Sequence, residues 1–429
     1  MTPLLRARLE YQQAHLRSRI GRLRETLAGQ LLRWSLRGES LLGFLERHQP
    51  GLHTERLQRF EDLRQRPARI VFTFCTLHFL DWFVPIHQAL ERLYPGQYGV
   101  LYLDYATTLR RVGSGWEYLR YREQVQSRML GLGVDPLLHA SHEELEAFGA
   151  PIPWQAGITC ESIRQERLQL PLRIYLPHYS LPKAIDRTLP ENIRFEHAFL
   201  PTRPPYSYAA LNDDPGSAQA MLHDVGYPKE CLPVEPNRIF PGDDRPVILY
   251  APSLEVPLLQ AALRQGLVEV FRNHPEWNFV VKLHPSLESR RHYVASFMKQ
   301  QLEGLPHVRF DSLSSIQSLA GEASVLITDF GSVGGEFRMS AGKRVVFLET
   351  PRRYAGGADL QFRDDFADAV CSVEALPQVL GEVLAQGDLS QEELQEMRTR
   401  VLTWDEAPDE RAAQVLHGLL QPAKPDLQA

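Results

Sequence analysis

The amino-acid sequence predicts an α/β protein with two doubly wound domains, each built on a parallel sheet that helices cover on both faces. Its 429 residues exceed the length of an ordinary single domain and suggest two. Short apolar runs rich in β-branched residues alternate with helical patterns, most regularly after residue 247. A polar, proline-rich stretch from Pro233 to Pro246 separates the two halves and is the expected linker.

The first half opens with a helical pattern and continues as alternating strands and helices. One or two helices are expected between residues 4 and 47, where leucines recur at helical spacing with arginines between them. A βαβ unit follows, with a strand at 70–74, a helix from Trp82 to Leu93 and a strand at 99–103. Further strands are expected at 136–139, 172–176 and 197–200, and a helix at 217–224.

The second half follows the same alternation more cleanly. Strands are expected at 247–251, 279–283, 308–310, 324–328 and 344–348. Helices are expected at 257–273, 316–320, 373–384 and 391–420. The predicted parts are a basic amphipathic helical segment (1–68), a first Rossmann-like domain (69–235), a second one (236–420) and a disordered tail (421–429).

Composition and charge narrow the class of protein. The hydrophobic fraction of 43% and the charged fraction of 23% are typical of a globular chain. The four cysteines are far apart and form no CxxC pair, which argues against a zinc site or a disulfide framework. No apolar run is long enough to span a bilayer and the N-terminus lacks a signal-peptide pattern, so a cytoplasmic location is expected.

The net charge of −6 hides an asymmetry between the beginning of the chain and the rest. Residues 1–69 hold 14 arginines, no lysine and 7 acidic residues, a balance of +7 that leaves −13 for the remainder. This distribution argues against nucleic acid as a partner of the main body. For residues 1–47 two interpretations stay open: an amphipathic contact with an anionic membrane surface, or a helical hairpin packed on the body.

The segment from Ser324 to Phe337 carries the strongest functional signal. An apolar strand stops at Thr328 and Asp329, turns through Gly331 and Ser332, and opens a helix. Free N–H groups and the positive end of the helix dipole make such a turn a site for a phosphate or diphosphate. Asp329 is expected to cap the helix. Glu336, near its first turn, would accept hydrogen bonds from substrate hydroxyls, although the dipole alone also favours a carboxylate there.

Two further strand ends carry a histidine. Lys282 and His284 end the strand at 279–283 and share one face of an extended segment, where a cation and an imidazole would neutralise charge on a leaving phosphate. The alternative is that His284 only caps a loop. His178 follows the strand at 172–176, and its ordinary pKa suits a general base for an acceptor hydroxyl. His78 also follows a strand, but its aromatic neighbours favour a packed histidine.

Five motifs in a fixed order carry a family resemblance, from about Tyr175 to Arg353. They are His-Tyr-Ser-Leu-Pro-Lys from 178, Gly-Tyr-Pro-Lys from 226, Leu-Tyr-Ala-Pro-Ser from 249, Lys-Leu-His-Pro from 282, and Thr-Asp-Phe-Gly-Ser with the following Glu-Phe from 328. In this order they resemble the CDP-glycerol glycerophosphotransferase family, the peripheral membrane polymerases and primases of teichoic-acid-type polymers. The resemblance implies a GT-B fold, in which two Rossmann-like domains face a cleft.

The resemblance also implies roles for individual residues. His178 matches the family's base histidine, although Tyr179 replaces the glycine of its His-Gly-Thr motif. His284 matches the phosphate-binding histidine of Lys-x-His-Pro. Gly331 and Ser332 match two phosphate-binding serines, so one hydroxyl is missing. Glu336 matches an aspartate that binds glycerol. Together with Lys282, Thr328 and Asp329, these residues form the expected donor site, with His178 and His284 as the catalytic pair.

The function expected from these observations is the transfer of a glycerol-phosphate, or a related polyol-phosphate or sugar, from a CDP-activated donor. The acceptor would be a hydroxyl of a membrane-linked or cell-envelope polymer, with the protein peripheral on the inner face of the membrane. No metal, no cofactor and no nucleic acid are expected. Two alternatives stay open: a UDP-sugar glycosyltransferase or nucleotide-sugar 2-epimerase, and a non-catalytic relative in envelope assembly.

Overall fold

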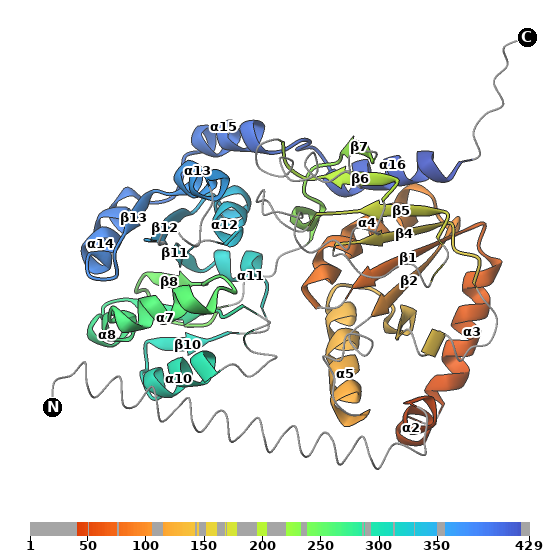
Figure 1. Cartoon of the computed structure of the whole chain (residues 1–429), viewed down its shortest axis with the longest axis horizontal. Coiled ribbons are helices and arrows are strands. Elements are labelled where there is room, and N and C mark those ends of the chain that lie inside the picture. The colour runs from red at the N-terminus through yellow and green to blue at the C-terminus, as the bar shows by residue number, and fades with distance from the viewer. Residues whose placement is uncertain are drawn as a thin grey trace, which may run out of the picture. The chain divides into compact units, whose positions relative to one another are not determined.

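The computed structural model of the chain describes most of the sequence in two compact units. The described residues are 41–49, 51–74, 77–104, 115–141, 144–145, 152–160, 168, 170–177, 195–203, 220–232, 238–284, 287, 293–311, 314–329, 331–349 and 357–421. One unit holds the described residues up to Leu232 together with those from Val401 onward, and the other holds those between Pro233 and Arg400. Each unit contains one sheet, shown in Figure 1.

The first unit is built on a sheet of seven parallel strands. Its strand order is β3-β2-β1-β4-β5-β6-β7, so the chain moves outward from β1 in one direction and then returns to continue from β4 on the other side. The strands are β1 (Ala68–Phe74), β2 (Tyr98–Asp104), β3 (His139–Ser141), β4 (Ala156–Thr159), β5 (Leu172–Tyr175), β6 (His197–Leu200) and β7 (Met221–Asp224). Each central strand is a short, nearly continuous apolar run, as expected for a strand covered on both faces.

Helices from both ends of the chain pack in this first unit. They are α2 (Leu41–His48), α3 (Leu52–Gln65), η1 (Leu77–Phe79), α4 (Leu80–Leu93), α5 (Gly115–Gly131), η2 (Pro136–Leu138), η5 (Pro228–Cys231) and α16 (Pro408–Leu420). Helix α4 is buried along most of its length and contacts β2, η5 and α16. Residues from Val401 onward therefore lie with the first sheet, whereas the sequence analysis placed them in the second domain.

The second unit is built on six parallel strands. Its order is β10-β9-β8-β11-β12-β13. Successive strands are added on one side of β8 as far as β10, and the chain then returns to add β11 on the other side of β8. The strands are β8 (Val247–Tyr250), β9 (Asn278–Val281), β10 (Val308–Phe310), β11 (Ala323–Thr328), β12 (Arg344–Leu348) and β13 (Ala369–Cys371). The helices are α7 (Val256–Arg264), α8 (Leu267–Asn273), α10 (Tyr293–Leu302), α11 (Ile316–Ala320), α12 (Val333–Ala341), α13 (Gly357–Phe366), α14 (Leu376–Gln386) and α15 (Gln391–Val401).

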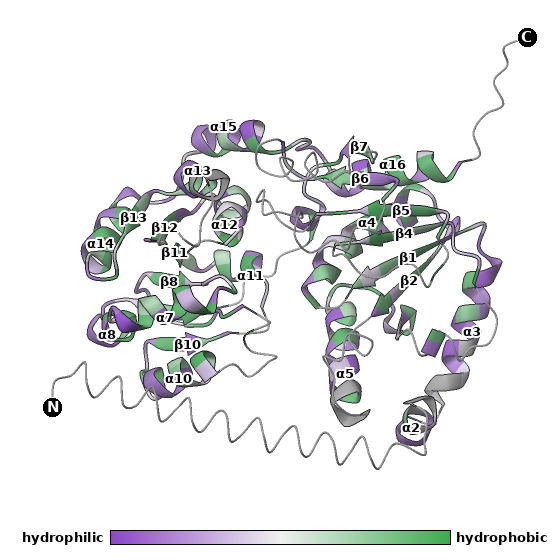
Figure 2. Cartoon of the chain, in the orientation of Figure 1, coloured by the Kyte–Doolittle hydropathy of each residue, from purple (hydrophilic) through white to green (hydrophobic). Residues whose placement is uncertain are grey.

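Both faces of the second sheet are covered. Alternate residues such as Ile248 and Tyr250 join one apolar cluster with side chains of α7, α8, α10 and α14. The opposite face of β12 presents Phe347, whose ring packs against α12 at Gly334. The hydropathy colouring of Figure 2 shows the same arrangement, with apolar strands and helices whose outer faces are polar. The predicted fold class of two doubly wound domains is confirmed.

Four predictions of secondary structure are wrong in detail. The predicted strand at 136–139 begins only at its last residue: Pro136–Leu138 form the 3-10 helix η2, capped by the Asp135 side chain, and β3 runs from His139 to Ser141. Residues Met221–Asp224 of the helix predicted at 217–224 form the edge strand β7 instead, because they pair with β6, while residues 217–219 lie outside the described residues. The predicted helix at 257–273 is divided into α7 and α8 at Gly266, whose φ of 96° lies in the left-handed region. The predicted helix at 391–420 is divided into α15 and α16.

The basic N-terminal segment is described from residue 41 onward, and its described helices pack on the first unit. Phe44 of α2 is buried, and α2 contacts α5. Helix α3 contacts β2 and η2 and places the side chain of Arg56 in the interior. The predicted helical region between residues 4 and 40 lies outside the described residues. None of the helices described here has the length and apolarity needed to cross a bilayer.

Candidate active site

The candidate site lies at the carboxyl edge of the second sheet. In doubly wound sheets, ligands bind outside the carboxyl ends of the strands, where the strand order reverses. Here the reversal falls between β8 and β11. The loops after these two strands are therefore neighbours, and both carry polar residues: Ser253 follows β8, while Asp329, Gly331 and Ser332 follow β11.

Side-chain hydrogen bonds join the two loops. Asp329 accepts two hydrogen bonds from Ser253: one from the backbone N–H to Oδ1 at 2.8 Å and one from the hydroxyl to Oδ2 at 3.2 Å. The hydroxyl of Thr328 donates to the carbonyl oxygen of Ala251 at 2.8 Å. Ser253, Thr328 and Asp329 are all buried. Burial, together with the negative charge of Asp329, raises the pKa of Tyr250 at the end of β8 well above its ordinary value.

Asp329 does not cap helix α12, as the sequence analysis expected. The helix begins one turn later, with Ser332 at the N-cap position, and Asp329 is bonded to Ser253 instead. The prediction failed because a strand-end carboxylate can satisfy either a following helix or a neighbouring loop, and only the tertiary structure brings Ser253 within reach. The N-terminus of α12 remains at the carboxyl edge, where its first N–H groups and dipole favour an anion.

The three glycines around this turn differ in whether close packing requires a residue without a side chain. A Cβ on Gly334 would lie 2.5 Å from the ring of Phe347, and one on Gly335 would lie 2.7 Å from the ring of Phe362, so both are small because the helix packs closely. Among the described residues, a Cβ on Gly331 would meet nothing closer than 3.5 Å, and the φ of Gly331 lies outside the left-handed region. Neither the packing of the described residues nor the backbone conformation requires a glycine at 331.

The end of β9 contributes a cation and an imidazole. The backbone N–H of Lys282 donates to the carbonyl oxygen of Tyr250 at 2.9 Å, which continues the pairing of β9 with β8 beyond the strands. Leu283 is buried in the apolar cluster, whereas Lys282 and His284 are half-buried. The carbonyl of His284 accepts from the N–H of Leu287 at 2.8 Å and so begins a turn. Both residues therefore lie at the carboxyl edge of the sheet, at the end of the strand that pairs with β8.

Glu336 is held by a neighbouring helix. It lies in the first turn of α12, is buried, and accepts a hydrogen bond from Nε2 of Gln317 on α11 at 2.9 Å. The sequence analysis missed Gln317, because no local signal connects α11 with α12. Ser253 was given no role either, although it follows the run 247–251 by two residues, as a polar residue near the carboxyl end of a predicted strand.

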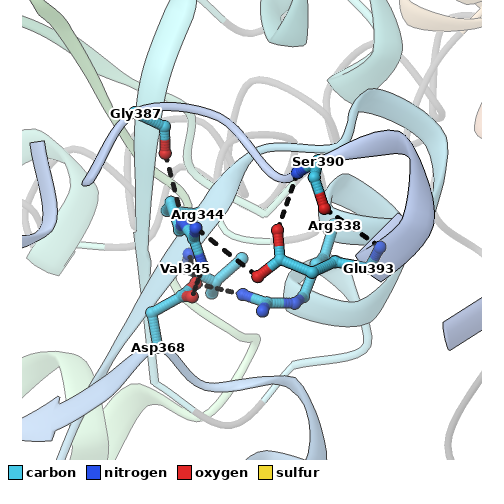
Figure 3. A network of polar contacts seen from close by, with 7 residues as sticks. All are labelled: Arg338, Arg344, Val345, Asp368, Gly387, Ser390 and Glu393. Atoms are coloured by element: carbon cyan, nitrogen blue, oxygen red, sulfur yellow. Dashed lines mark hydrogen bonds and ion pairs between the residues drawn. The ribbon is translucent and has the colours of Figure 1, made fainter. Parts of the chain in front are cut away.

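The far end of α12 is anchored by a second polar network (Figure 3). Asp368 accepts from Arg338 of α12, from Nη1 of Arg344 at 2.9 Å and from the backbone N–H of Val345 at 2.7 Å. Arg344 also donates to the carbonyl of Gly387 at 3.0 Å. Since the Asp368 side chain is only 4% exposed, this network fixes α12 and the start of β12 relative to each other.

The described residues thus bring Lys282, His284, Thr328, Asp329, Gly331, Ser332 and Glu336 to one edge of one sheet. His178, the predicted general base, lies outside the described residues. Within the described part of the chain, no three histidine, cysteine or carboxylate side chains are grouped closely enough to hold a metal ion.

Comparisons with known proteins agree with this architecture. No family model matches the sequence, and no curated protein matches it significantly. Among solved structures, the UDP complex of S. aureus MnaA is similar, with a TM-score of 0.55 and 12% identity over 82% of this chain and 95% of that one. The UDP-GlcNAc 2-epimerase of Methanocaldococcus jannaschii, in complex with UDP-GlcNAc and UDP, has a TM-score of 0.49 and 11% identity over 82% and 100% of the two chains.

A glycosyltransferase, SnogD from Streptomyces nogalater, is similar at a TM-score of 0.47 and 16% identity over 82% of this chain and 99% of that one. At such low identities, similarity of structure establishes the fold alone. The chain has two Rossmann-like domains of the GT-B type.

Proposed function

We propose that this protein is a transferase that uses a nucleotide-diphosphate donor, bound at the carboxyl edge of the second sheet. The observation that carries the proposal is the junction of β8 and β11. There the N-terminus of α12, the small residue Gly331 and the hydroxyl of Ser332 lie at the reversal of strand order, with Lys282 and His284 on the next strand. Dipole, N–H groups, ammonium and imidazole all favour a diphosphate.

Each residue has a defined task in this proposal. The backbone at Gly331 and the hydroxyl of Ser332 bind donor phosphate, while His284 and Lys282 neutralise the charge that develops on the leaving group. Glu336, oriented by Gln317, accepts hydrogen bonds from donor hydroxyls. His178 removes the proton from the acceptor hydroxyl.

The transferred group determines which bond breaks. In glycerophosphate transfer, the acceptor oxygen attacks the β-phosphorus of CDP-glycerol, the bond between this phosphorus and the bridging oxygen breaks, and CMP leaves. In sugar transfer, the acceptor oxygen attacks the anomeric carbon and a nucleoside diphosphate leaves. We propose the first reaction, on the five motifs that resemble the CDP-glycerol family, with a lipid-linked or polymeric envelope hydroxyl as acceptor. An anionic membrane surface would be contacted by residues 1–47.

A second candidate is a nucleotide-sugar 2-epimerase or UDP-sugar glycosyltransferase. It is supported by the structural similarity to the UDP complex of S. aureus MnaA. Thr328–Ser332, with Gly335 and Glu336, also resembles the epimerase pattern Thr-Asp-Ser-Gly-Gly followed by Glu-Glu. An epimerase needs no acceptor, so turnover of UDP-N-acetylglucosamine alone would favour this candidate.

Product analysis separates the two reactions. The protein is incubated with CDP-glycerol, CDP-ribitol or UDP-sugars and a hydroxyl acceptor, and the nucleotide formed is identified. We expect CMP from CDP-glycerol. Release of UDP, or epimerisation without acceptor, would overturn the proposed donor. If no donor is turned over although one binds, the protein is a non-catalytic relative of these enzymes.

Binding of CDP and UDP, measured by titration calorimetry, tests the site itself. Loss of a charge-assisted hydrogen bond to phosphate is expected to weaken affinity about 10- to 100-fold in Ser332→Ala and His284→Ala. Two controls of the same residue types lie away from the site: Ser390→Ala before α15, where the hydroxyl accepts from the N–H of Glu393, and His274→Ala, where the side chain bonds Glu276 before β9 begins. The controls should change affinity less than about twofold. Equal effects at His284 and His274 would remove His284 from the site.

Turnover tests the catalytic pair. We expect His178→Ala and His284→Ala to abolish transfer while the melting temperature falls by no more than a few degrees, as expected when a residue serves catalysis and not packing. Full activity in either variant would remove that residue from the catalytic assignment.

A further inference from the structure

We propose that Asp329 is a positioning residue that acts through Ser253 and fixes the spacing of the loops after β8 and β11. This inference rests on the proposed function, because the donor diphosphate would bind beside these two loops. It assigns Asp329 no contact with the donor, in contrast to the sequence-based expectation. It also gives a role to Ser253, which the sequence analysis left without one.

Two hydrogen bonds between Asp329 and Ser253 join the loop after β11 to the loop after β8. We call this pair of hydrogen bonds the clamp. Both carboxylate oxygens of Asp329 are used on one residue, Ser253, at 2.8 Å and 3.2 Å. The Ser253 hydroxyl also accepts from the N–H of Glu255 at 3.3 Å, which bends the loop toward α7. A Cβ on Gly331 would lie 3.7 Å from Cβ of Ser253, so the clamped loop directly faces the phosphate-binding turn. A change in the clamp therefore changes the space beside Gly331.

The negative charge of Asp329 lies close to the proposed phosphate-binding turn. Asp329 is 5% exposed and lies two residues before Gly331, so its negative charge opposes the binding of an anion there. The charge of this carboxylate by itself lowers the affinity for a diphosphate. We infer that its two hydrogen bonds to the loop after β8 offset this loss by holding the two loops in place. The clamp and the charge thus have opposite effects on affinity, and substitutions can separate them.

The experiment measures the affinity of the full-length chain for CDP, UDP and inorganic pyrophosphate. Asp329→Ala removes both the charge and the clamp; Asp329→Asn removes the charge but keeps an oxygen for the Ser253 N–H. We expect Asp329→Ala to weaken binding about tenfold and Asp329→Asn to recover most of that loss, since hydrogen bonds of this kind are each worth roughly that factor. Ser253→Ala, which keeps the backbone bond, is expected to weaken binding about threefold. The double variant Asp329→Ala/Ser253→Ala is expected to bind no more weakly than Asp329→Ala alone.

Asp311 provides a matched control. It follows β10 and accepts from the backbone N–H and the hydroxyl of Ser314, at 2.8 Å and 2.6 Å, in the same two-point manner but within one local turn. Asp311→Ala should change affinity less than about twofold, while it removes the same chemical groups.

The outcomes are distinguishable. If Asp329→Ala binds as tightly as the wild type or more tightly while Ser332→Ala binds weakly, the clamp is overturned and the donor site stands. If the wild type binds pyrophosphate but neither nucleotide, the proposed function fails and the clamp is judged on pyrophosphate. If the wild type binds none of the three probes, both proposals are overturned.

Discussion

The two sheets use buried charge in different ways. In the first unit, Glu144 is enclosed by Arg56 and Arg122, and all three are at most 3% exposed. Arg56 also donates to the carbonyl oxygen of His139 at 2.7 Å, and the ring of His139 bonds Asp104 at 2.5 Å with both residues fully buried. In the second unit, Lys282, His284 and Ser332 are half-buried at the carboxyl edge of the sheet.

The difference teaches which polar residues serve architecture and which serve chemistry. A charge that is fully enclosed and paired cannot meet a ligand, and it fixes the elements that carry its partners. The cluster around Glu144 joins α3 and α5 to the strand β3. Half-buried polar groups at the carboxyl ends of parallel strands lie where doubly wound sheets bind their ligands. Substitutions in the buried cluster should therefore change stability, and substitutions at the edge of the second sheet should change nucleotide binding.

The largest effect is expected when the buried cluster is broken. Glu144→Ala leaves two arginines buried without their carboxylate, and breaking such a cluster typically lowers the free energy of unfolding by about 3–5 kcal/mol. The pKa of Glu144 supports this: burial is the largest single cause and raises it, but Arg56 and Arg122, together with the Ser141 N–H and His139, bring it below its ordinary value. Urea denaturation measures the change. Protein that remains folded should bind nucleotide as the wild type does.

Arg59 is the control for this prediction. It pairs with Asp135 at 2.9 Å, but the two side chains are 47% and 31% exposed. Arg59→Ala should therefore lower the free energy of unfolding by less than about 1 kcal/mol. Equal losses in the Glu144 and Arg59 variants would show that enclosure does not set the energy of these pairs.

A smaller effect is expected from pH acting on His87. Burial lowers the pKa of His87 to about 4, and its Nδ1 bonds the Tyr102 hydroxyl at 3.0 Å. The unfolded chain takes up this proton near pH 6.5 and the folded chain only near pH 4, so stability is present above 6.5 and is lost as pH falls between the two values. The loss should be about 3 kcal/mol.

The variant His87→Gln tests this by removing the titrating group. Its free energy of unfolding should depend less steeply on pH between 6.5 and 4. A residual slope of the same sign is expected, because burial also lowers the pKa values of His197 and His223. If the pH dependence of His87→Gln equals that of the wild type, His87 is not the group that titrates.

The smallest effects compare two glycines in one turn. Gly334→Ala drives a methyl group into the ring of Phe347 and should lower the free energy of unfolding by about 1–3 kcal/mol. Gly331→Ala meets only ordinary contacts and should change stability by less than about 0.5 kcal/mol. Under the proposed function, however, Gly331→Ala weakens nucleotide binding, because the methyl group occupies the phosphate side of the turn. Urea unfolding and titration calorimetry on both variants check that Gly334→Ala lowers stability and that Gly331→Ala lowers nucleotide affinity.

Local signals sufficed for much of the fold and for part of the site. The apolar β-branched runs located most strands of the second sheet, because each is buried on both faces and reads as a continuous apolar segment. The strand-end rule then selected Lys282, His284, Asp329 and Ser332. The same signals failed at Met221–Asp224, where a short polar edge strand has no local pattern that separates it from a helix.

The sequence by itself determined the two parallel sheets and the kind of residue at each strand end, since these follow from hydrophobic periodicity and turn chemistry along the chain. Only the tertiary structure decided the partners: Ser253 for Asp329, Gln317 for Glu336, Arg56 for Glu144, and α4 for the C-terminal helix α16. Such pairs join residues far apart in the chain. The packing of whole helices and strands decides which polar groups meet. The periodicity of the sequence does not predict these partners, because many polar groups are compatible with one another.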